Sequence, residues 1–170
     1  MEQVLTSPDG STIAQKFVRA FGSVFVQNTY PQDLRYKLIP KDIVTCTIFC
    51  SSGNAYTVDC ETGNPTEGIQ AGVMWGGASP WIKEYDVHIT EPTVVYCYDE
   101  LLNNGKKLNL IPVDLPQGES TTFTGGTKFL LCNGVLHINN VEFVGPTAIE
   151  ITTSDKVVVP QTRCLGIKIA

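Results

Sequence analysis

The sequence has few of the groups that most often carry catalysis, metal binding or nucleic-acid binding. It contains two histidines in 170 residues, and Asp, Glu, Lys and Arg together make up 17% of the chain. The net charge is −5, and no run of Lys and Arg is long enough to track a phosphate backbone. We therefore expect no general affinity for nucleic acid.

Long apolar runs and a targeting signal are also absent. No stretch of about 20 apolar residues occurs, so we expect no membrane-spanning segment and no membrane partner. The first residues, MEQVLTSPDGSTIAQKF, lack the basic start and apolar run of a secretory signal. We expect the chain to stay in a reducing compartment.

The six cysteines follow no C-x-x-C spacing, and two histidines do not easily complete a zinc site. Cys46 and Cys50 are four residues apart, which on a β-strand places both on one face. Free cysteine commonly packs as a small apolar side chain. We expect core packing in the first place, disulfides second and metal binding last, and we expect no cofactor.

Known catalytic motifs such as G-x-S-x-G, the P-loop and H-E-x-x-H do not occur. The strongest catalytic candidates are His137 and Glu142, in VLHINNVEFV. Asn139-Asn140 is suited to a two-residue type I′ turn, which would pair His137 directly with Glu142. Side chains alternate along a strand, so this pair would lie opposite a core face made by the following residues: Leu136, Ile138, Val141 and Phe143.

We therefore predict a surface pair at His137 and Glu142 and no catalytic site, because general acid–base catalysis needs a pocket and a third, orienting group. The other histidine, His88, shares a strand face with Asp86, and we expect that face to be solvated.

Short runs of Val, Ile, Thr and aromatic residues recur along the chain, separated by turn segments such as SSGN, LNNGK, TGGT and TSDK. This pattern predicts an all-β protein with a jelly-roll or β-sandwich fold. No internal repeat is recognisable.

The N-terminal segment is the one candidate for a helix. Ile13, Phe17 and Phe21 follow one another at four-residue spacing. The segment forms either a short helix on the sandwich or an arm that docks on a neighbouring subunit, and both alternatives stay open. The expected organisation is an arm or helix over residues 1–21 and a single β domain over residues 22–170.

From about Leu115 to the end, the order of elements resembles the second half of a cupin-type jelly roll. Metal-binding cupins have a Gly, five residues, and then His-x-His. In this sequence Gly118 is followed at that spacing by Thr124, Gly125 and Gly126. The resemblance therefore implies a cupin-like frame without the metal.

Metal-free jelly rolls with an N-terminal arm and acidic charge are also similar to small virion proteins of tailed phages. This resemblance implies a non-enzymatic structural protein, a capsid decoration or cement protein or a tail component, found in the virion and in the host cytoplasm during assembly. We expect a homo-oligomer, a trimer in the first place, with other virion proteins as partners. The candidate interface anchors are Phe17, Phe21, Trp75 and Trp81, because aromatic residues dominate interface hot spots.

The alternative is a cupin-like protein that binds a carbohydrate or another small molecule, or an enzyme acting on one. Tyr96, Tyr98, Asp99 and Glu100, in VVYCYDE, would then line the mouth of the barrel, where aromatic rings stack on sugars.

Overall fold

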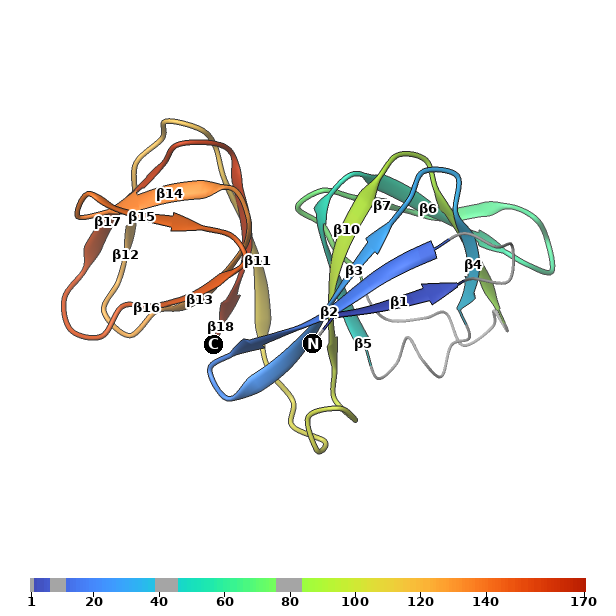
Figure 1. Ribbon diagram of the computed structural model, residues 1–170, viewed down its shortest axis with the longest axis horizontal. Coiled ribbons are helices and arrows are strands. Elements are labelled where there is room, and N and C mark those ends of the chain that lie inside the picture. The colour runs from blue at the N-terminus through green and yellow to red at the C-terminus, as the bar shows by residue number, and fades with distance from the viewer. Residues whose placement is uncertain (1, 7–11, 39–45, 76–83) are drawn as a thin grey trace. The chain divides into compact units, whose positions relative to one another are not determined.

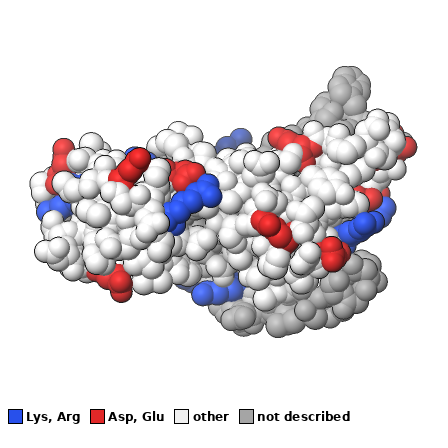
Figure 2. Space-filling view, turned by 90° about the horizontal axis from the view of Figure 1, so that it is seen from above, with Lys and Arg blue, Asp and Glu red and all other residues white. Residues whose placement is uncertain are grey.

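The structure is a computed structural model that describes residues 2–6, 12–38, 46–75 and 84–170. Within these ranges the chain is all β, with strands joined by turns and no helix (Figure 1). No helix of the described residues is long and apolar enough to cross a membrane. On the face in Figure 2, the described Lys and Arg side chains are interspersed with Asp and Glu.

The chain divides into two compact units. Unit 1 comprises Met1–Val18 and Val24–Lys106, and unit 2 comprises Arg19–Ser23 and Lys107–Ala170. The expected division was an arm or short helix over residues 1–21 and a single domain over residues 22–170, whereas the chain forms two compact units.

Unit 1 is built from two antiparallel sheets, ordered β1-β2-β3-β10-β5-β8 and β4-β9-β6-β7. The strands are β1 (Glu2–Thr6), β2 (Thr12–Ala20), β3 (Ser23–Tyr30), β4 (Arg35–Leu38), β5 (Cys46–Ser52), β6 (Asn54–Asp59), β7 (Pro65–Gln70), β8 (Met74–Trp75), β9 (Tyr85–Ile89) and β10 (Thr93–Asp99).

Unit 2 also has two antiparallel sheets, ordered β11-β18-β13-β16 and β12-β17-β14-β15. The strands are β11 (Leu110–Leu115), β12 (Thr121–Phe123), β13 (Lys128–Asn133), β14 (Val135–Ile138), β15 (Val141–Val144), β16 (Thr147–Glu150), β17 (Lys156–Pro160) and β18 (Cys164–Ile169).

The two units share one topology. Counted from β11, the first, eighth, third and sixth strands form one sheet of unit 2, and the second, seventh, fourth and fifth form the other. Counted from β3, the strands up to β10 repeat this order, and the hairpin β1–β2 extends one sheet beside β3. This is the strand order of a jelly roll, so the predicted fold class is confirmed.

The duplication extends to single residues. In β5 the pairing with β10 skips Ser51, because Val94 pairs with Ser52 and Val95 pairs with Cys50. In β13 the pairing with β18 skips Cys132 in the same way, between Leu131 and Asn133. Two residues after each skipped position stands a glycine with positive φ, Gly53 (φ 82) and Gly134 (φ 112). A Cβ on either glycine would lie closer than 3.0 Å to backbone of the neighbouring strand. A β-bulge and a tight glycine therefore shape the same corner twice.

The N-terminal segment forms strand β2, so the short helix considered for it is wrong. Residues spaced by four, such as Ile13 and Phe17, lie on one face of a helix but equally on one face of a strand, because four is an even number. Pairing with β1 and the burial of Val18 and Ala20 decide for the strand. The turn into β3 has positive φ at Phe21 and Gly22.

The interior of the second jelly roll is apolar. Phe123 and Phe129 meet edge to face, with ring centroids 5.1 Å apart. Around them pack other buried side chains: Leu115, Leu131, Leu136, Ile138, Ile149, Ile151, Val158 and Cys164.

The interior of the first jelly roll contains polar aromatic groups as well. Tyr30 and Tyr36 stack at 5.0 Å between ring centroids, and Trp75 meets Tyr85 edge to face at 6.1 Å. Burial raises the pKa of both Tyr30 and Tyr36 above the ordinary tyrosine value. The two interiors therefore share a strand topology but differ in their side chains, because only the first contains tyrosine and tryptophan.

Candidate functional site

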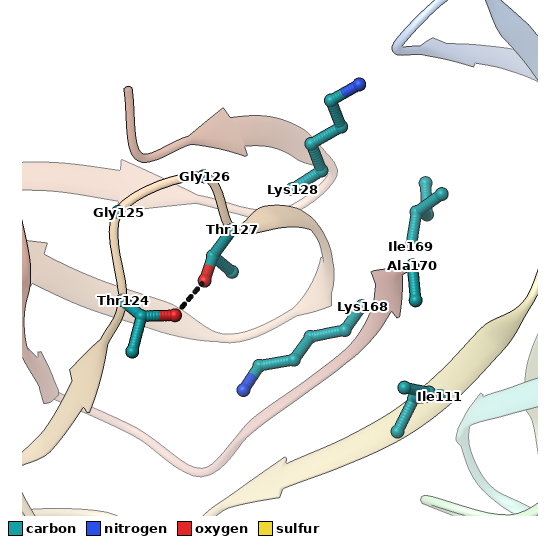
Figure 3. A pocket seen from close by; sticks show the side chains of 9 residues that line it. All are labelled: Ile111, Thr124, Gly125, Gly126, Thr127, Lys128, Lys168, Ile169 and Ala170. Atoms are coloured by element: carbon teal, nitrogen blue, oxygen red, sulfur yellow. Dashed lines mark hydrogen bonds between the residues drawn. The ribbon is translucent and has the colours of Figure 1, made fainter. Parts of the chain in front are cut away.

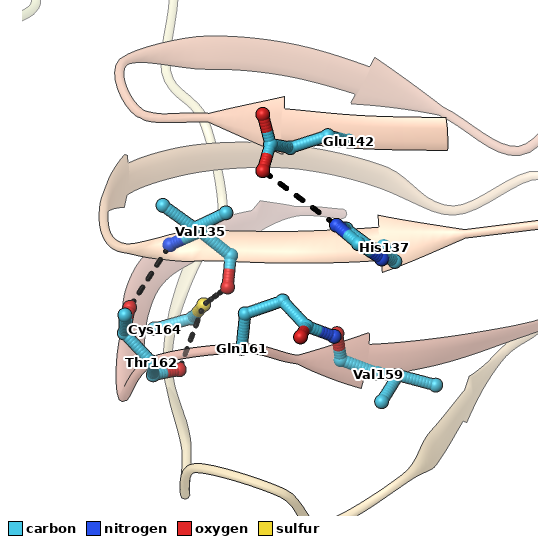
Figure 4. Close-up of polar contacts among 7 residues, drawn as sticks. All are labelled: Val135, His137, Glu142, Val159, Gln161, Thr162 and Cys164. Atoms are coloured by element: carbon cyan, nitrogen blue, oxygen red, sulfur yellow. Dashed lines mark hydrogen bonds and ion pairs between the residues drawn. The ribbon is translucent and has the colours of Figure 1, made fainter. Parts of the chain in front are cut away.

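The hairpin at residues 135–144 forms as predicted. His137 is paired with Glu142, and Asn139 (φ 51) and Asn140 (φ 61) make the two-residue turn. The His137 Nε2 and Glu142 Oε1 atoms are 3.6 Å apart on the outer face of the sheet, with 62% of the Glu142 side chain exposed (Figure 4). The prediction of a surface pair is confirmed. One member of the expected core face, Val141, is 55% exposed at the end of the hairpin.

The second histidine also lies on an outer sheet face. His88 Nδ1 is 3.1 Å from the Tyr56 hydroxyl on the neighbouring strand, and their rings are 4.9 Å apart. Its neighbours along β9, Val87 and Ile89, are buried. Neither histidine therefore lies in a jelly-roll interior.

The four predicted interface anchors have different environments. Trp75 is 2% exposed in the core of unit 1 and donates its indole N–H to Glu67, so its side chain offers no surface to a partner. Phe17 and Phe21 are half-buried. Trp81 lies outside the described residues. An interface through Phe17, Phe21 or Trp81 stays a prediction.

The aromatic pair in β10 does not line a mouth. Tyr96 and Tyr98 are 1% and 2% exposed. Gln27 Nε2 donates to the Tyr96 hydroxyl at 2.7 Å, and the Tyr98 hydroxyl donates to the Lys106 carbonyl at 2.6 Å. Both rings therefore pack and bond internally, and sugar stacking on them is not supported.

The two acidic residues predicted beside them occupy a turn. The Asp99 side chain accepts a hydrogen bond from the Leu101 backbone N–H at 2.8 Å. The Glu100 carbonyl accepts from Gly105 at 2.7 Å. These contacts are typical of a tight turn rather than of a binding site.

A pocket lies at one end of the second jelly roll, where β12 passes into β13 and β18 ends (Figure 3). We call it the Lys168 pocket, and its volume is about 360 Å³. Its lining residues are Ile111, Thr124, Gly125, Gly126, Thr127, Lys128, Lys168, Ile169 and Ala170.

The rim of the pocket is the tight turn from Thr124 to Thr127, closed by a hydrogen bond from the Thr127 N–H to the Thr124 carbonyl at 3.1 Å. Gly126 has a φ of 92°, which glycine adopts without strain. A Cβ on Gly125 would lie 2.6 Å from the Thr153 carbonyl oxygen. Both glycines are therefore required by the backbone of this turn.

The backbone N–H groups of the turn are already used. Gly125 donates to the Asp155 carboxylate at 3.0 Å, and Gly126 donates to the Ile151 carbonyl at 2.5 Å. The hydroxyls of Thr124 and Thr127 lie 3.2 Å apart, and each retains capacity for another hydrogen bond. A ligand would therefore meet hydroxyls and lysines at this rim, not free amides.

Lys168 is the cation that projects into the pocket. It pairs with Phe129, whose side chain is in the core, so both lie on the inner side of the sheet. Its Nζ sits 5.0 Å from the centre of the Phe123 ring, a favourable cation–π position. In Figure 3 Lys168 runs beneath the Thr124–Thr127 turn, whereas Lys128 points away from it.

The pocket does not fit a metal ion. Its lining residues include no His, Cys, Asp or Glu side chain. Within the described residues no group of three or more His, Cys, Asp or Glu side chains is arranged to hold a metal.

Sequence reasoning did not single out Lys168 or Lys128. The available signal was the TGGT turn, which marks a tight loop but not which strand ends meet beside it. Lys168 comes 41 residues after Thr127 in the sequence numbering and reaches the turn only through the pairing of β13 with β18.

No family model and no curated protein matches the chain. Among solved structures, HutD from Pseudomonas fluorescens SBW25 is similar with a TM-score of 0.54 and 10% identity, covering 99% of this chain and 94% of that one. AerE from Microcystis aeruginosa has a TM-score of 0.53 and 9% identity, covering 99% and 96%. Quercetin 2,3-dioxygenase from Acinetobacter baumannii has a TM-score of 0.48 and 10% identity, covering 98% and 82%.

These comparisons correct two expectations. The prediction of a structural virion protein is wrong, because HutD and AerE, both similar over the whole chain with TM-scores above 0.5, are not named as virion proteins. The prediction of a non-enzyme was part of the same structural-protein hypothesis and is corrected with it. At these identities the likeness shows the fold alone, and the strand order of each unit makes that fold a jelly roll, present twice.

Proposed function

We propose that the protein binds a small anionic molecule, of the carboxylate or phosphate class, in the Lys168 pocket. The observation that carries this proposal is a pocket of about 360 Å³ with an inward lysine and no acidic side chain in its lining. The volume falls in the range of about 300–1,000 Å³ that is usual for small-molecule sites.

The charge of the pocket runs against that of the chain. The sequence has a net charge of −5, whereas two of the nine lining residues are lysines and none is acidic. No ion pair of Lys168 or Lys128 is formed within the part of the chain that the structure describes. An ammonium held against a ring and next to two hydroxyls is suited to a carboxylate or phosphate oxygen.

The rest of the lining favours a ligand with a short apolar portion. Ile111 pairs with Lys168 on the neighbouring strand and presents aliphatic surface beside it. A neutral sugar is less favoured, because Tyr96 and Tyr98 are buried and no aromatic ring lines the pocket.

Titration calorimetry with inorganic phosphate and with succinate, a short dicarboxylate, tests this proposal at low salt. We expect at least one probe to bind, and Lys168→Met to weaken that binding by about tenfold or more, because a charged hydrogen bond contributes about 1.5–3 kcal/mol. Lys107→Met is the matched control, since Lys107 is an exposed lysine that does not line the pocket.

Equal binding by the wild type and Lys168→Met would overturn the proposed site, as would no binding of either probe. Met retains most of the aliphatic stem over Phe123, so the fold of the variant is expected to persist, and its thermal unfolding curve checks this.

A further inference from the structure

A cysteine pair, Cys46 and Cys97, lies in the first jelly roll at the positions that correspond to the Lys168 pocket of the second. We call this end of each jelly roll its mouth. Ile48 and Phe129 each stand three residues before the skipped residue of the bulge, so they are equivalent positions. Ile48 pairs with Cys97, and Phe129 pairs with Lys168, so Cys97 and Lys168 are equivalent as well. Two residues before Ile48 stands Cys46, and two residues before Phe129 stands Thr127. Cys97 and Cys46 are therefore the counterparts of two residues that line the Lys168 pocket.

The two cysteines are joined in a disulfide, with their Cα atoms 6.1 Å apart. That distance lies within the range of about 4.4–6.8 Å that disulfides span. They stand diagonally across the β5–β10 pair, because Cys97 pairs with Ile48 and Cys46 with Asp99. Both side chains are half-buried, so part of each is exposed to solvent.

The other four cysteines lie in different environments and remain thiols. Cys50 is fully buried, and burial raises the pKa of its thiol to about 11. Burial also raises the pKa of Cys132 and of Cys164. For Cys60, burial and then the neighbouring Asp86 raise the thiol pKa. None of these four is favoured as the thiolate that reacts.

We propose that Cys46 and Cys97 are a reversible dithiol–disulfide site that exchanges with low-molecular-weight disulfides of the glutathione class. The thiolate of one cysteine attacks a sulfur of the disulfide reagent, forms a mixed disulfide and releases one thiol. The second cysteine then attacks the protein-side sulfur and releases the other thiol. Two protein thiols are oxidised to one disulfide, one reagent disulfide is reduced to two thiols, and the two protons pass to those thiols.

The expected consequence is a covalent tie between β5 and β10 at the mouth of the first jelly roll. The bridge spans 51 residues of sequence, and such a loop restricts the unfolded chain substantially. In a reducing compartment, the pair would open and close with the thiol–disulfide balance. This inference does not depend on the proposed anion pocket, which lies in unit 2.

Peptide mapping tests the site directly. The full chain is equilibrated with reduced or oxidised glutathione, alkylated without unfolding, and digested with trypsin, which cleaves at Lys83 between the two cysteines. We expect a Cys46–Cys97 cross-linked peptide after the oxidised reagent, its loss after the reduced one, and a higher unfolding temperature for the oxidised protein. In Cys46→Ser and Cys97→Ser the temperature difference should vanish, whereas Cys60→Ser should keep both effects.

Alkylation of Cys46 and Cys97 to the same extent in both buffers would overturn the proposal. So would a Cys97 cross-link that persists in Cys46→Ser, because Cys97 would then have another partner. A bridge that survives reduced glutathione would show a permanent structural disulfide and would also overturn it. The wild-type mapping decides even where a serine variant fails to fold.

Discussion

The two jelly rolls of this chain keep the same backbone and differ in what fills it. In both, a bulge and a tight glycine, Gly53 or Gly134, shape the strand that crosses the sandwich. At equivalent places the first has Cys50 and the second Leu131, both fully buried. At the mouth, Cys97 stands where Lys168 stands. The comparison teaches that the backbone devices of a fold constrain sequence more tightly than its interior chemistry does.

The difference also sets how each interior is stabilised. The core cluster of the second interior contains no tyrosine, tryptophan or charged group, so apolar burial stabilises it without buried hydroxyl or indole groups. The first buries hydroxyl and indole groups, which must find hydrogen-bond partners to avoid a desolvation cost. Trp75 meets that requirement through Glu67.

The largest expected effect is the loss of a core ring in unit 2. Phe129 is fully buried, so Phe129→Ala should lower the free energy of unfolding by about 3–5 kcal/mol through lost burial and a cavity. Hydrogen exchange followed by mass spectrometry should place the lost protection in unit 2. Equal loss of protection in both units would contradict the expectation that each unit is stabilised by its own core.

The next effect tests the shared backbone device. Gly134→Ala should destabilise unit 2 by about 2–4 kcal/mol, since the new Cβ meets strand backbone and φ stays positive. Gly118→Ala is the matched control. It has a φ of 79° with nothing within 4 Å of a Cβ, so it should cost only about 1 kcal/mol. Denaturant unfolding compares the two, and equal losses would show that the close approach is unimportant.

A smaller effect concerns the polar interior of unit 1. Trp75→Phe removes the indole N–H that bonds Glu67, and we expect a coupling free energy of about 1 kcal/mol between these residues. A double-mutant cycle with Glu67→Ala, measured by denaturant unfolding, isolates that coupling from the loss of packing. Strict additivity would mean that the bond contributes nothing.

The smallest effect concerns a surface pair of unit 2. Arg163 donates to Asp114 at 3.0 and 2.8 Å, and this hydrogen bonding lowers the pKa of Asp114 below its ordinary value. A lowered folded-state pKa gives stability that is present above the ordinary aspartate pKa and is lost as the pH falls through the lowered one.

Both partners are about half exposed, so Asp114→Asn should cost less than about 1 kcal/mol at neutral pH. Thermal unfolding across an acid series should show the variant and the wild type converging once Asp114 is protonated. A difference that persists in acid would assign the effect to something other than the ion pair.

Local pattern predicted the all-β class, the turn at Asn139-Asn140 and the pairing of His137 with Glu142. These depend on neighbours in sequence, because side-chain alternation and a two-residue turn fix register without distant contacts. The helix considered near Phe17 was wrong, because it depended on local spacing that does not distinguish a helix from a strand. Four-residue spacing suits both helix and strand, and only the partner strand β1 distinguished them.

The sequence by itself therefore determined the all-β class and the register of the hairpin at residues 135–144. Only the tertiary structure showed that the jelly roll occurs twice and which residues meet at the equivalent end of each one. Lys168 meets Thr127, and Cys46 meets Cys97, only after strands distant in sequence pair across a sheet. The physical reason is that backbone hydrogen bonds define the jelly roll, and many different side chains are compatible with the same bonds. Two segments can share one topology while their sequences show no repeat.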